Sequence, residues 1–224
     1  VENRENRGFS GGNNDGIKYA FQKYDPNFFY LLNNDTKVTR GWLTEAVKTA
    51  EGDRKIGIVG SKQLNFEGKA TIRAGRIHTF GVKYYWGEED KEVTWVSGAG
   101  FLIKKEVIMK IGMFDEMYNP AYYEETDFEK RAITAGFKIF QSARSIFLHK
   151  GGGTTEKDRK VNYDLIFYKN RARFFSKYNL PGFLIRMITD IIRTSRRLKF
   201  SDLIKAYSLG VKSRNKSLIE NPYA

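Results

Sequence analysis

Two spacings of apolar residues alternate along the first 150 positions, one typical of helices and one of buried strands. Residues 13–24 place apolar side chains at helical spacing behind Asn13 and Asn14, either of which could cap the helix. Residues 28–32 (FFYLL) and 56–60 (IGIVG) are unbroken apolar runs of strand length, and a helix is predicted between them over 39–51. This order predicts an α/β fold with a mostly parallel sheet flanked by helices.

Residues 61–94 interrupt this rhythm with glycines and aromatics, which predicts hairpins or a long excursion. Further on, strands are predicted over 93–96, 101–103 and 137–149, and helices over 104–111 and 124–135, each ended by a glycine. From residue 158 onward the pattern is helical, with a break at Pro181-Gly182. We therefore expect an α/β domain over residues 1–157 and a helical region over 158–224.

Composition and charge narrow the classes of function. The chain has 224 residues, of which 41% are hydrophobic, so it can bury a sizeable core and disorder is excluded as its main state. Residues 1–150 hold 23 basic and 20 acidic side chains, a net of +3, whereas 151–224 hold 16 and 6, a net of +10. The positive charge of residues 151–224 suits an anionic partner, which could be a membrane, a nucleic acid or a phosphorylated substrate.

Two features that the sequence lacks, cysteine and a long apolar run, narrow the possible chemistry and location. The chain has no cysteine, which rules out disulfides, thiolate catalysis and Cys-ligated zinc. It has no apolar run near the roughly 18 residues that span a bilayer, and its first residues lack a signal-peptide core. We expect a cytoplasmic protein, either free or peripheral on the inner face of the cell membrane.

The segment LLNNDT delivers Asn33 and Asp35 from the end of an apolar strand, where open α/β sheets bind ligands. A carboxylate and an amide oxygen there suit Mg²⁺ or Mn²⁺ together with a diphosphate, because these cations prefer oxygen ligands. An Asx turn that caps the following helix is the alternative interpretation.

The segment YYEETDFEKRA gathers Glu124, Glu125 and Asp127 in one helical turn. Carboxylates at a helix start stabilise it through the dipole, which alone explains the pattern. Mutual repulsion of the acids can also raise one pKa toward that of a general base, and Arg131 is placed to pair with Asp127.

Three further segments are candidate binding elements. His149 ends an apolar strand and precedes three glycines, so it is either a core residue or a group open to a ligand. The Gly-rich segment 7–14 could cradle phosphate at a helix start, although it fits neither a P-loop nor G-x-G-x-x-G. The small residues Ser97, Gly98 and Ala99, which follow Trp95, allow either close approach of a ligand or a tight turn.

Taken in order, the segments ENRGFSGGNNDGIKYA, LLNNDT, VTWVSGAGFLIKKEVIMKIGMFDE, YYEETDFEKRAITAGFKI and LHKGGG resemble the family 2 glycosyltransferases of the GT-A type, most closely their rhamnosyltransferase-like branch. The resemblance covers residues 3–155. It implies a metal-dependent, inverting transfer of a sugar from a UDP- or dTDP-linked donor to a hydroxyl of a saccharide or polyprenyl-linked acceptor.

The resemblance also implies roles for single residues. Asp35 stands at the metal-binding acid of the family's D-x-D element and Asn33 at its first position, while His149 lies near the metal and the diphosphate. Glu125 occupies the position of the catalytic base, with Glu124 and Asp127 beside it. The expected substrate-binding residues are Asn6, Gly11, Asn13, Asn14, Asn33, Trp95, Ser97, Gly98 and Ala99.

The sequence departs from the family in two ways. The base position often holds Asp and here holds Glu125, so Asp127 is a candidate to share the role. The family's opening strand-helix-strand unit should precede Asn3, so we expect a donor pocket that lacks one wall. A catalytically incomplete binding or regulatory module is therefore the alternative function.

The basic tail has its own pattern. Over 183–207, Leu184, Ile188, Ile191 and Ile192 fall on one side of a helix and Arg186, Arg193, Arg196 and Arg197 fall toward the other. Such a helix either lies on an anionic membrane or packs on the catalytic domain with a solvated basic face. We do not expect a nucleic-acid partner, because the aromatics of the tail are spaced for core packing.

Overall fold

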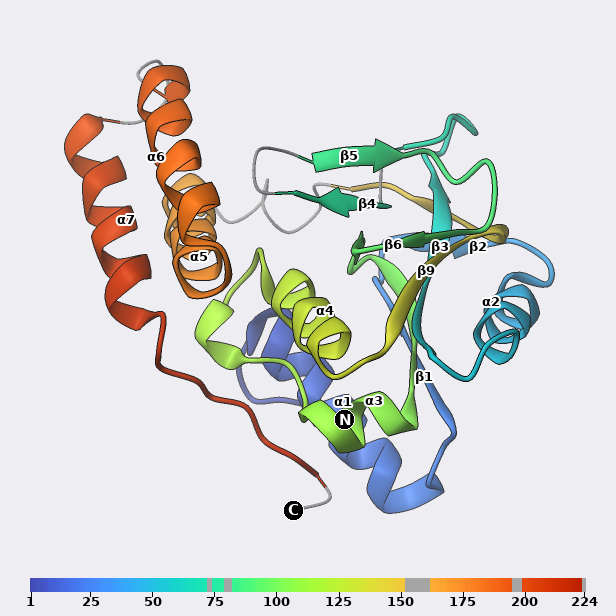
Figure 1. The fold of residues 1–224 in the computed structure, drawn as a ribbon. Helices are drawn as coiled ribbons and strands as arrows, with labels where there is room; N and C mark the ends of the chain where they lie inside the picture. The colour runs from blue at the N-terminus through green and yellow to red at the C-terminus, as the bar shows by residue number, and fades with distance from the viewer. Residues whose placement is uncertain (72–73, 79–81, 152–161, 195–198, 223–224) are drawn as a thin grey trace.

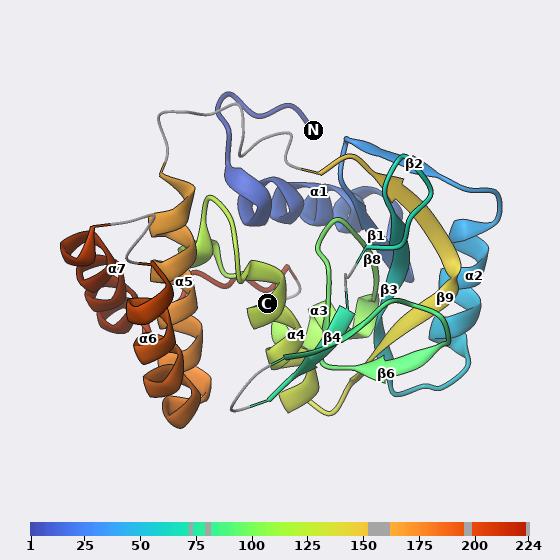
Figure 2. The ribbon, with the colours of Figure 1, turned by 90° about the horizontal axis from the view of Figure 1, so that it is seen from above.

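A six-stranded sheet between two layers of helices forms the body of the protein (Figure 1 and Figure 2). The computed structural model describes residues 1–71, 74–78, 82–151, 162–194 and 199–222. Helix α2 (Trp42–Glu51) covers one face of the sheet. Helices α1 (Gly8–Tyr24), α3 (Lys105–Ile111) and α4 (Glu124–Thr134) cover the other. The predicted α/β architecture is confirmed.

The strand directions differ from the predicted mostly parallel sheet. The order is β1 (Phe28–Leu32), β8 (Gly100–Lys104), β3 (Ile56–Leu64), β9 (Lys138–His149) and β2 (Thr36–Val38), and β6 (Lys91–Val93) also pairs with β9. Among the pairs of this sheet that the structure describes, only β3 and β9 run parallel. An apolar run predicts burial and not direction, and β8 returns antiparallel between β1 and β3.

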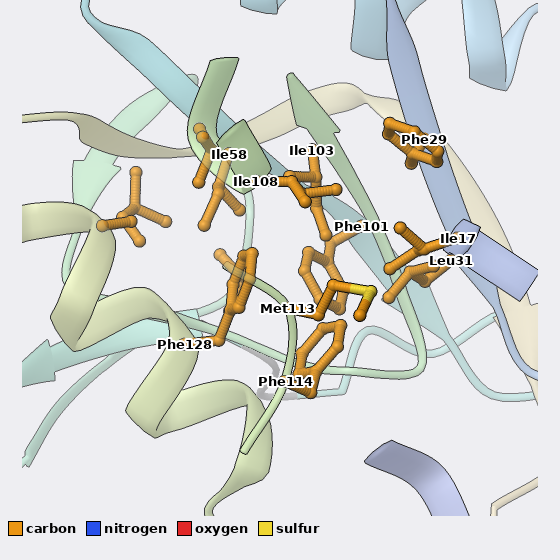
Figure 3. Close-up of a cluster of buried hydrophobic side chains, with 14 of the residues drawn as sticks. Ile17, Phe29, Leu31, Ile58, Phe101, Ile103, Ile108, Met113, Phe114 and Phe128 are labelled. Carbon is orange, nitrogen blue, oxygen red and sulfur yellow. The ribbon is translucent and has the colours of Figure 1, made fainter. Parts of the chain in front are cut away.

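The main core fills the space between this sheet and the α1, α3 and α4 layer (Figure 3). Phe101 and Ile103 from β8 meet Phe114 and Phe128, and the last two rings stack with centroids 4.5 Å apart. These side chains are fully buried. Because each fully buried side chain of this size stabilises the fold by about 1.5–3 kcal/mol, the cluster fixes α4 on the sheet.

The irregular segment after β3 forms a small second sheet, as the hairpin interpretation predicted. Its strands are ordered β5 (Val82–Tyr85), β4 (Ala74–Ile77) and β7 (Trp95–Val96), all antiparallel. Figure 1 shows the β4–β5 hairpin above the main sheet. Strand β7 therefore carries Trp95 beside the hairpin and leads directly into the turn before β8.

Helix α1 begins five residues before the predicted start, at Gly8. The Asn6 side chain accepts a hydrogen bond from the Gly8 N–H at 2.9 Å. The predicted caps Asn13 and Asn14 lie inside the helix, where Asn14 binds the backbone of Phe114 through both its amide nitrogen and its oxygen. This tertiary anchor overrides the weak helix propensity of the glycines.

The C-terminal region contains α5 (Tyr163–Tyr178), α6 (Leu180–Thr194) and α7 (Phe200–Ser213). The single helix predicted over 183–207 is wrong, since α6 and α7 are separate. The predicted break also lies earlier, at Asn179, whose side chain accepts from the Gly182 N–H and leaves Pro181 in the first turn of α6. The expected boundary at residue 157, Arg196 and Arg197 lie outside the described residues.

A buried ion pair ties these helices to the α/β body. Arg173 of α5 and Asp115 are both fully buried and 2.9 Å apart, and Arg173 also donates to the carbonyls of Ser213 and Lys216. Asp115 accepts the N–H groups of Met117 and Leu218 through its other oxygen. At Gly112, with φ of +72°, a Cβ would lie 2.7 Å from Ile219, so the segment near residue 219 packs directly on the end of α3.

We expect Arg173→Met to lower the free energy of unfolding by about 3–5 kcal/mol, because it leaves the Asp115 carboxylate buried without its cation. Urea unfolding measures this loss. The control Lys212→Met, at an exposed position of α7, should change it by less than about 0.5 kcal/mol. An equal effect of both variants would contradict the anchoring role.

Candidate functional site

Two pockets meet at the start of helix α4. Pocket A has a volume of about 490 Å³ and is lined by Asn6, Gly8, Phe9, Asn33, Asn34, Asp35, Pro120, Ala121, Tyr122, Glu124, Glu125, His149 and Tyr163. Pocket B, of about 270 Å³, lies between the β4–β5 hairpin and helices α5 and α6. Glu125 and Tyr122 line both pockets, so the first turn of α4 forms the wall between them.

Pocket A brings together the polar residues expected at the ends of two strands. Thr36 of β2 pairs with His149 of β9, which sets Asp35 beside the imidazole. His149 Nε2 lies 3.0 Å from Asp35 Oδ1 and 3.5 Å from Asn33 Nδ2, and His149 Nδ1 is buried without a hydrogen bond. The predicted grouping of Asn33, Asp35 and His149 is therefore present.

These residues fit a divalent cation that shares its coordination with phosphate. Among the described residues, no group of three or more His, Cys, Asp or Glu side chains could hold a metal by itself. Asp35 and His149 offer one oxygen and one nitrogen side by side. Mg²⁺ is usually bound through one or two carboxylates and completes its shell with phosphate and water, so the donor set of Asp35 with His149 is compatible with such a cation only when a phosphate shares the coordination.

Glu125 enters the site from an unusual backbone. Tyr122 and Tyr123, directly before α4, have φ of +75° and +72°, a region that costs non-glycine residues energy and that clusters at functional sites. Nearby N–H groups, its own, that of the Trp95 indole and that of Thr126, favour the ionised form of the Glu125 carboxylate. Part of its surface stays accessible from the pockets.

Burial sets the protonation of the acids at this helix start. Burial raises the pKa of Glu125, although the nearby N–H groups oppose the shift. Glu124 lines pocket A, and burial together with the Glu125 charge raises the pKa of Glu124 well above its usual range. Glu125 is thus placed to take up a proton, while Glu124 favours its neutral form.

Asp127 lies in a different place from the expected one. It is fully buried, lines neither pocket, and accepts from Tyr118, Tyr178, Lys177 and Arg131. The predicted pair with Arg131 forms at 2.8 Å. Although burial raises it, the cationic neighbours hold the pKa of Asp127 below its usual range, so this carboxylate is ionised and cannot approach an acceptor in either pocket.

The small-residue turn packs beside Glu125. A Cβ at Gly98 would lie 3.0 Å from the Phe9 ring, a tight contact, and 3.6 Å from Glu125 Cβ, an ordinary one, so Gly98 lies directly against both residues. The Ala99 carbonyl accepts from the Asn33 N–H at 3.0 Å, and the Ser97 hydroxyl accepts from the Ala99 N–H. The turn therefore connects Asn33, at the end of β1, with Glu125 at the start of α4.

Of the expected substrate-binding residues, only Asn6 and Asn33 line pocket A, Trp95 lines pocket B, and Ser97, Gly98 and Ala99 line neither. Three more, all in the Gly-rich segment, also lie away from pocket A. Gly11 is buried against Arg7, and Asn13 donates to the Phe9 carbonyl within α1. Asn14 holds Phe114. Asn6 lines pocket A, and of the Gly-rich segment 7–14 only Gly8 and Phe9, at the start of α1, do so.

The sequence pattern missed Asn170 of α5. This fully buried side chain donates to the carbonyls of Tyr118, Ala121 and Tyr122, and so holds the loop that leads into α4. Its only signal was an amide among the aromatic and basic residues of a helix. Tyr163 in pocket A and Arg186 in pocket B were likewise not assigned to the site.

The comparisons with known proteins identify the family. The family model described as "Glycosyl transferase family 2" matches residues 1–112, half of the chain. The protein belongs to family 2 of the glycosyltransferases.

Relatives support the same family. The chain is 28% identical over 149 residues to the low-salt glycan biosynthesis hexosyltransferase Agl10 of Haloferax volcanii, which covers 63% of this chain and 48% of that protein. The chain thus spans about half the length of this curated relative. A rhamnosyltransferase-like branch remains a prediction.

Two solved structures share the fold. GalNAc-T7, crystallised with UDP, GalNAc and Mn²⁺, matches with a TM-score of 0.62 at 14% identity over 96% of this chain and 44% of that one. The mannosyltransferase PcManGT from Pyrobaculum calidifontis, in complex with GDP-Man and Mn²⁺, matches with a TM-score of 0.51 at 12% identity over 96% and 63%. At such identities the likeness is one of fold, and it confirms the expected GT-A fold.

A buried acid one turn after Glu125 offers a test of these electrostatics. Glu129 is fully buried, and its Oε1 accepts from the Val96 N–H at 2.9 Å. Burial and then the Glu125 charge raise the pKa of Glu129 well above its usual range. In the unfolded chain this carboxyl ionises near pH 4.3, so folding stability falls as the pH rises above that value.

We expect Glu129→Gln, which keeps an acceptor for Val96, to gain stability over the wild type as the pH rises from 4 to 8. Urea unfolding at several pH values measures this difference. The control Glu106→Gln, at an exposed position of α3, should show a difference that barely changes with pH. A constant Glu129→Gln difference would mean that the buried acid is not the cause.

Proposed function

We propose that the chain carries the transfer site of an inverting, metal-dependent glycosyltransferase that moves a sugar from a nucleoside diphosphate to an acceptor hydroxyl. One observation carries the proposal. A half-buried glutamate, Glu125, whose pKa is raised, shares pocket A with a carboxylate–imidazole pair suited to a cation and a diphosphate. The Mn²⁺ and nucleotides bound by the two similar structures support it.

In this proposal the donor diphosphate lies in pocket A. Asp35 and His149 would hold Mg²⁺ or Mn²⁺, with Asn33 beside them, and such a cation would supply positive charge against the leaving diphosphate. A UDP- or dTDP-linked sugar is the expected donor. The turn 97–100 closes the site next to the sugar.

Glu125 acts on the acceptor. The acceptor oxygen attacks the anomeric carbon from the side opposite the diphosphate, the carbon–oxygen bond to the diphosphate breaks, and its electron pair leaves with the diphosphate. The acceptor proton passes to a Glu125 oxygen. Because burial raises the pKa of Glu125, the carboxylate is a stronger proton acceptor than an exposed glutamate, and a positioned base contributes about 10²–10⁴ in rate.

The acceptor is proposed to be a cell-surface or polyprenyl-linked saccharide at the cytoplasmic face of a membrane. On α6, Leu180, Leu184, Ile188 and Ile192 recur every four residues and are 48–71% exposed. Such a stripe suits the boundary of a lipid bilayer. Arg186 does not belong to a solvated face, since it turns toward Phe175. Within the described chain no helix is long and apolar enough to cross a bilayer.

Two substitutions separate donor binding from chemistry. We expect Asp35→Asn to weaken UDP or dTDP binding only when Mn²⁺ is present, and Glu125→Gln to keep that binding while turnover falls by about 10²–10⁴. Titration calorimetry and a sugar-transfer assay measure the two effects. Asp53→Asn is the control. Asp53 pairs with Lys138, at the end of β9 opposite His149, so this variant should change neither nucleotide binding nor turnover.

Metal-independent binding in the wild type would contradict the proposed role of Asp35. Binding of neither nucleotide would instead favour the incomplete, regulatory module. Full turnover in Glu125→Gln would exclude this residue as the base.

The proposed contact between α6 and a membrane has its own test. We expect the chain to sediment with vesicles that contain anionic lipid, and Leu184→Ser together with Ile188→Ser to reduce the bound fraction severalfold, because both remove apolar area from the stripe. Met109→Ser on α3, an equally exposed apolar position, is the control. Equal binding of all variants would show that α6 does not face the membrane.

A further inference from the structure

A third cavity, which we call pocket C, adjoins pocket B. It has a volume of about 480 Å³, within the roughly 300–1,000 Å³ of most ligand pockets. Pockets B and C share the side chains of Ile77, Thr126 and Phe175 as lining residues. No residue that lines pocket C lines pocket A. The three cavities therefore follow one another, with pocket B in the middle.

One face of α4 forms a wall of pocket C. Thr126, Lys130 and Ile133 line the cavity, and their spacing of four and then three residues places them on the same side of the helix. Ile133 comes eight residues after Glu125, which is about 12 Å along the helix axis at 1.5 Å per residue. Pocket C therefore reaches farther from Glu125 than a single sugar ring extends.

Aromatic rings from α5 form the wall of pocket C that does not belong to α4. Phe174, Phe175 and Tyr178 line it together, and Ile77 of strand β4 adds an aliphatic surface. A sugar ring presents C–H groups on its faces, and these groups pack well on the negative face of an aromatic ring. This wall therefore offers stacking surfaces for a pyranose.

The polar groups of pocket C suit sugar hydroxyls. The cavity is lined by the imidazole of His78, the hydroxyls of Thr94 and Thr126, the ammonium of Lys130 and the amide of Asn179, and by no Asp or Glu. Thr94 Oγ1 accepts from the Ile77 N–H at 2.8 Å, and Asn179 Oδ1 accepts from the Gly182 N–H at 3.1 Å. Because a sugar hydroxyl both donates and accepts, a mixed set of donors and acceptors held in place in this way suits it.

The proposed reaction leaves a larger acceptor one continuation beyond pocket B. The donor diphosphate takes pocket A, so the acceptor hydroxyl approaches Glu125 from pocket B. The volume of pocket B, about 270 Å³, has room for one small unit. Any further unit of the acceptor has to lie outside pocket B, and pocket C adjoins it with a lining suited to sugars.

We propose that pocket C is a second sugar subsite, which binds the unit of a glycan acceptor that follows the reacting one. This inference rests on the proposed glycosyl transfer. The enzyme then elongates an existing oligosaccharide, and an earlier glycosyl transfer must supply its acceptor. His78, Lys130 and Asn179 are the specificity-determining residues, and only His78 lies within the region that the family model matches.

Titration calorimetry with acceptor analogues of two lengths tests the proposal. The probes are maltotriose, cellotriose, chitotriose and mannotriose, each paired with the methyl glycoside of its own monosaccharide and added to the full chain with UDP and Mn²⁺. We expect at least one trisaccharide to bind about tenfold or more tighter than its monosaccharide, the equivalent of one or two net hydrogen bonds. No dependence on length in any of the four pairs would overturn the proposal.

Two variants assign the preference for length to pocket C. Lys130 is half-buried and His78 is exposed, so Lys130→Ala and His78→Ala should both fold. Each should lower the affinity for the trisaccharide severalfold more than the affinity for the monosaccharide. The control Lys205→Ala removes an exposed cation from α7 and should leave the preference intact. A preference that survives both pocket C variants, or that is lost equally in the control, would overturn the assignment.

Inorganic phosphate tests whether His78 and Lys130 form a simple anion site instead. Phosphate that binds more tightly than every trisaccharide, and that loses this binding in Lys130→Ala, would overturn the sugar subsite.

The binding of UDP, measured in the same samples, separates this inference from the proposed function. Metal-dependent UDP binding without any preference for length would overturn the second subsite alone. Loss of UDP binding in the wild type would count against the proposed donor site, while the paired sugars still report on pocket C.

Discussion

The buried carboxylate of Asp127 is the constraint on which the geometry of the site depends. It accepts hydrogen bonds from both sides of the junction between the α/β body and the C-terminal helices, from Arg131 on its own helix and from Lys177 and Tyr178 on α5. A carboxylate this deep is tolerated only because cations and hydroxyls surround it. The start of α4, and with it Glu125, is thereby fixed against α5.

Asn170 completes this arrangement from the same helix. Its amide nitrogen donates to the carbonyls of Tyr118, Ala121 and Tyr122 in the loop that precedes α4. The left-handed backbone of Tyr122 turns the chain into the helix. The C-terminal helices are thus a structural part of the site and not an appendage. Helix α5 lines both pockets that meet at Glu125, pocket A through Tyr163 and pocket B through Phe167 and Phe175, and it positions the wall between them.

The sequence allowed much of the fold to be predicted, since unbroken apolar runs and helical spacings mark the buried elements whatever their neighbours. The direction of β8 was not accessible from such patterns, because it depends on pairing between distant strands. Asn33, Asp35 and His149 could be grouped from motif order, as could Glu124 and Glu125. Asp127 could not be separated from them, because three acids in one helical turn look alike until their partners are known.

Asn14 and Arg186 are two residues whose roles the sequence pattern suggested wrongly. Asn14 stood in a segment typical of phosphate binding, yet its partner is the Phe114 backbone, 100 residues away. Arg186 stood in a basic helical pattern, yet the aromatic ring of Phe175 turns it inward. In each case a tertiary contact with a distant residue decided the role of the side chain.

The packing of the segment near residue 219 has a consequence for the order in which the protein acquires its structure. The backbone groups of Met113 and Glu116 find their partners in Glu220 and Leu218, roughly a hundred residues later in the chain. A ribosome makes the α/β body first, but the loop between α3 and α4 stays without these partners until residues 218–220 have emerged. The body can collapse during synthesis. The loop before α4 gains these hydrogen bonds only when translation has passed those residues, so its last backbone contacts form after the strands and helices of the body are already synthesised.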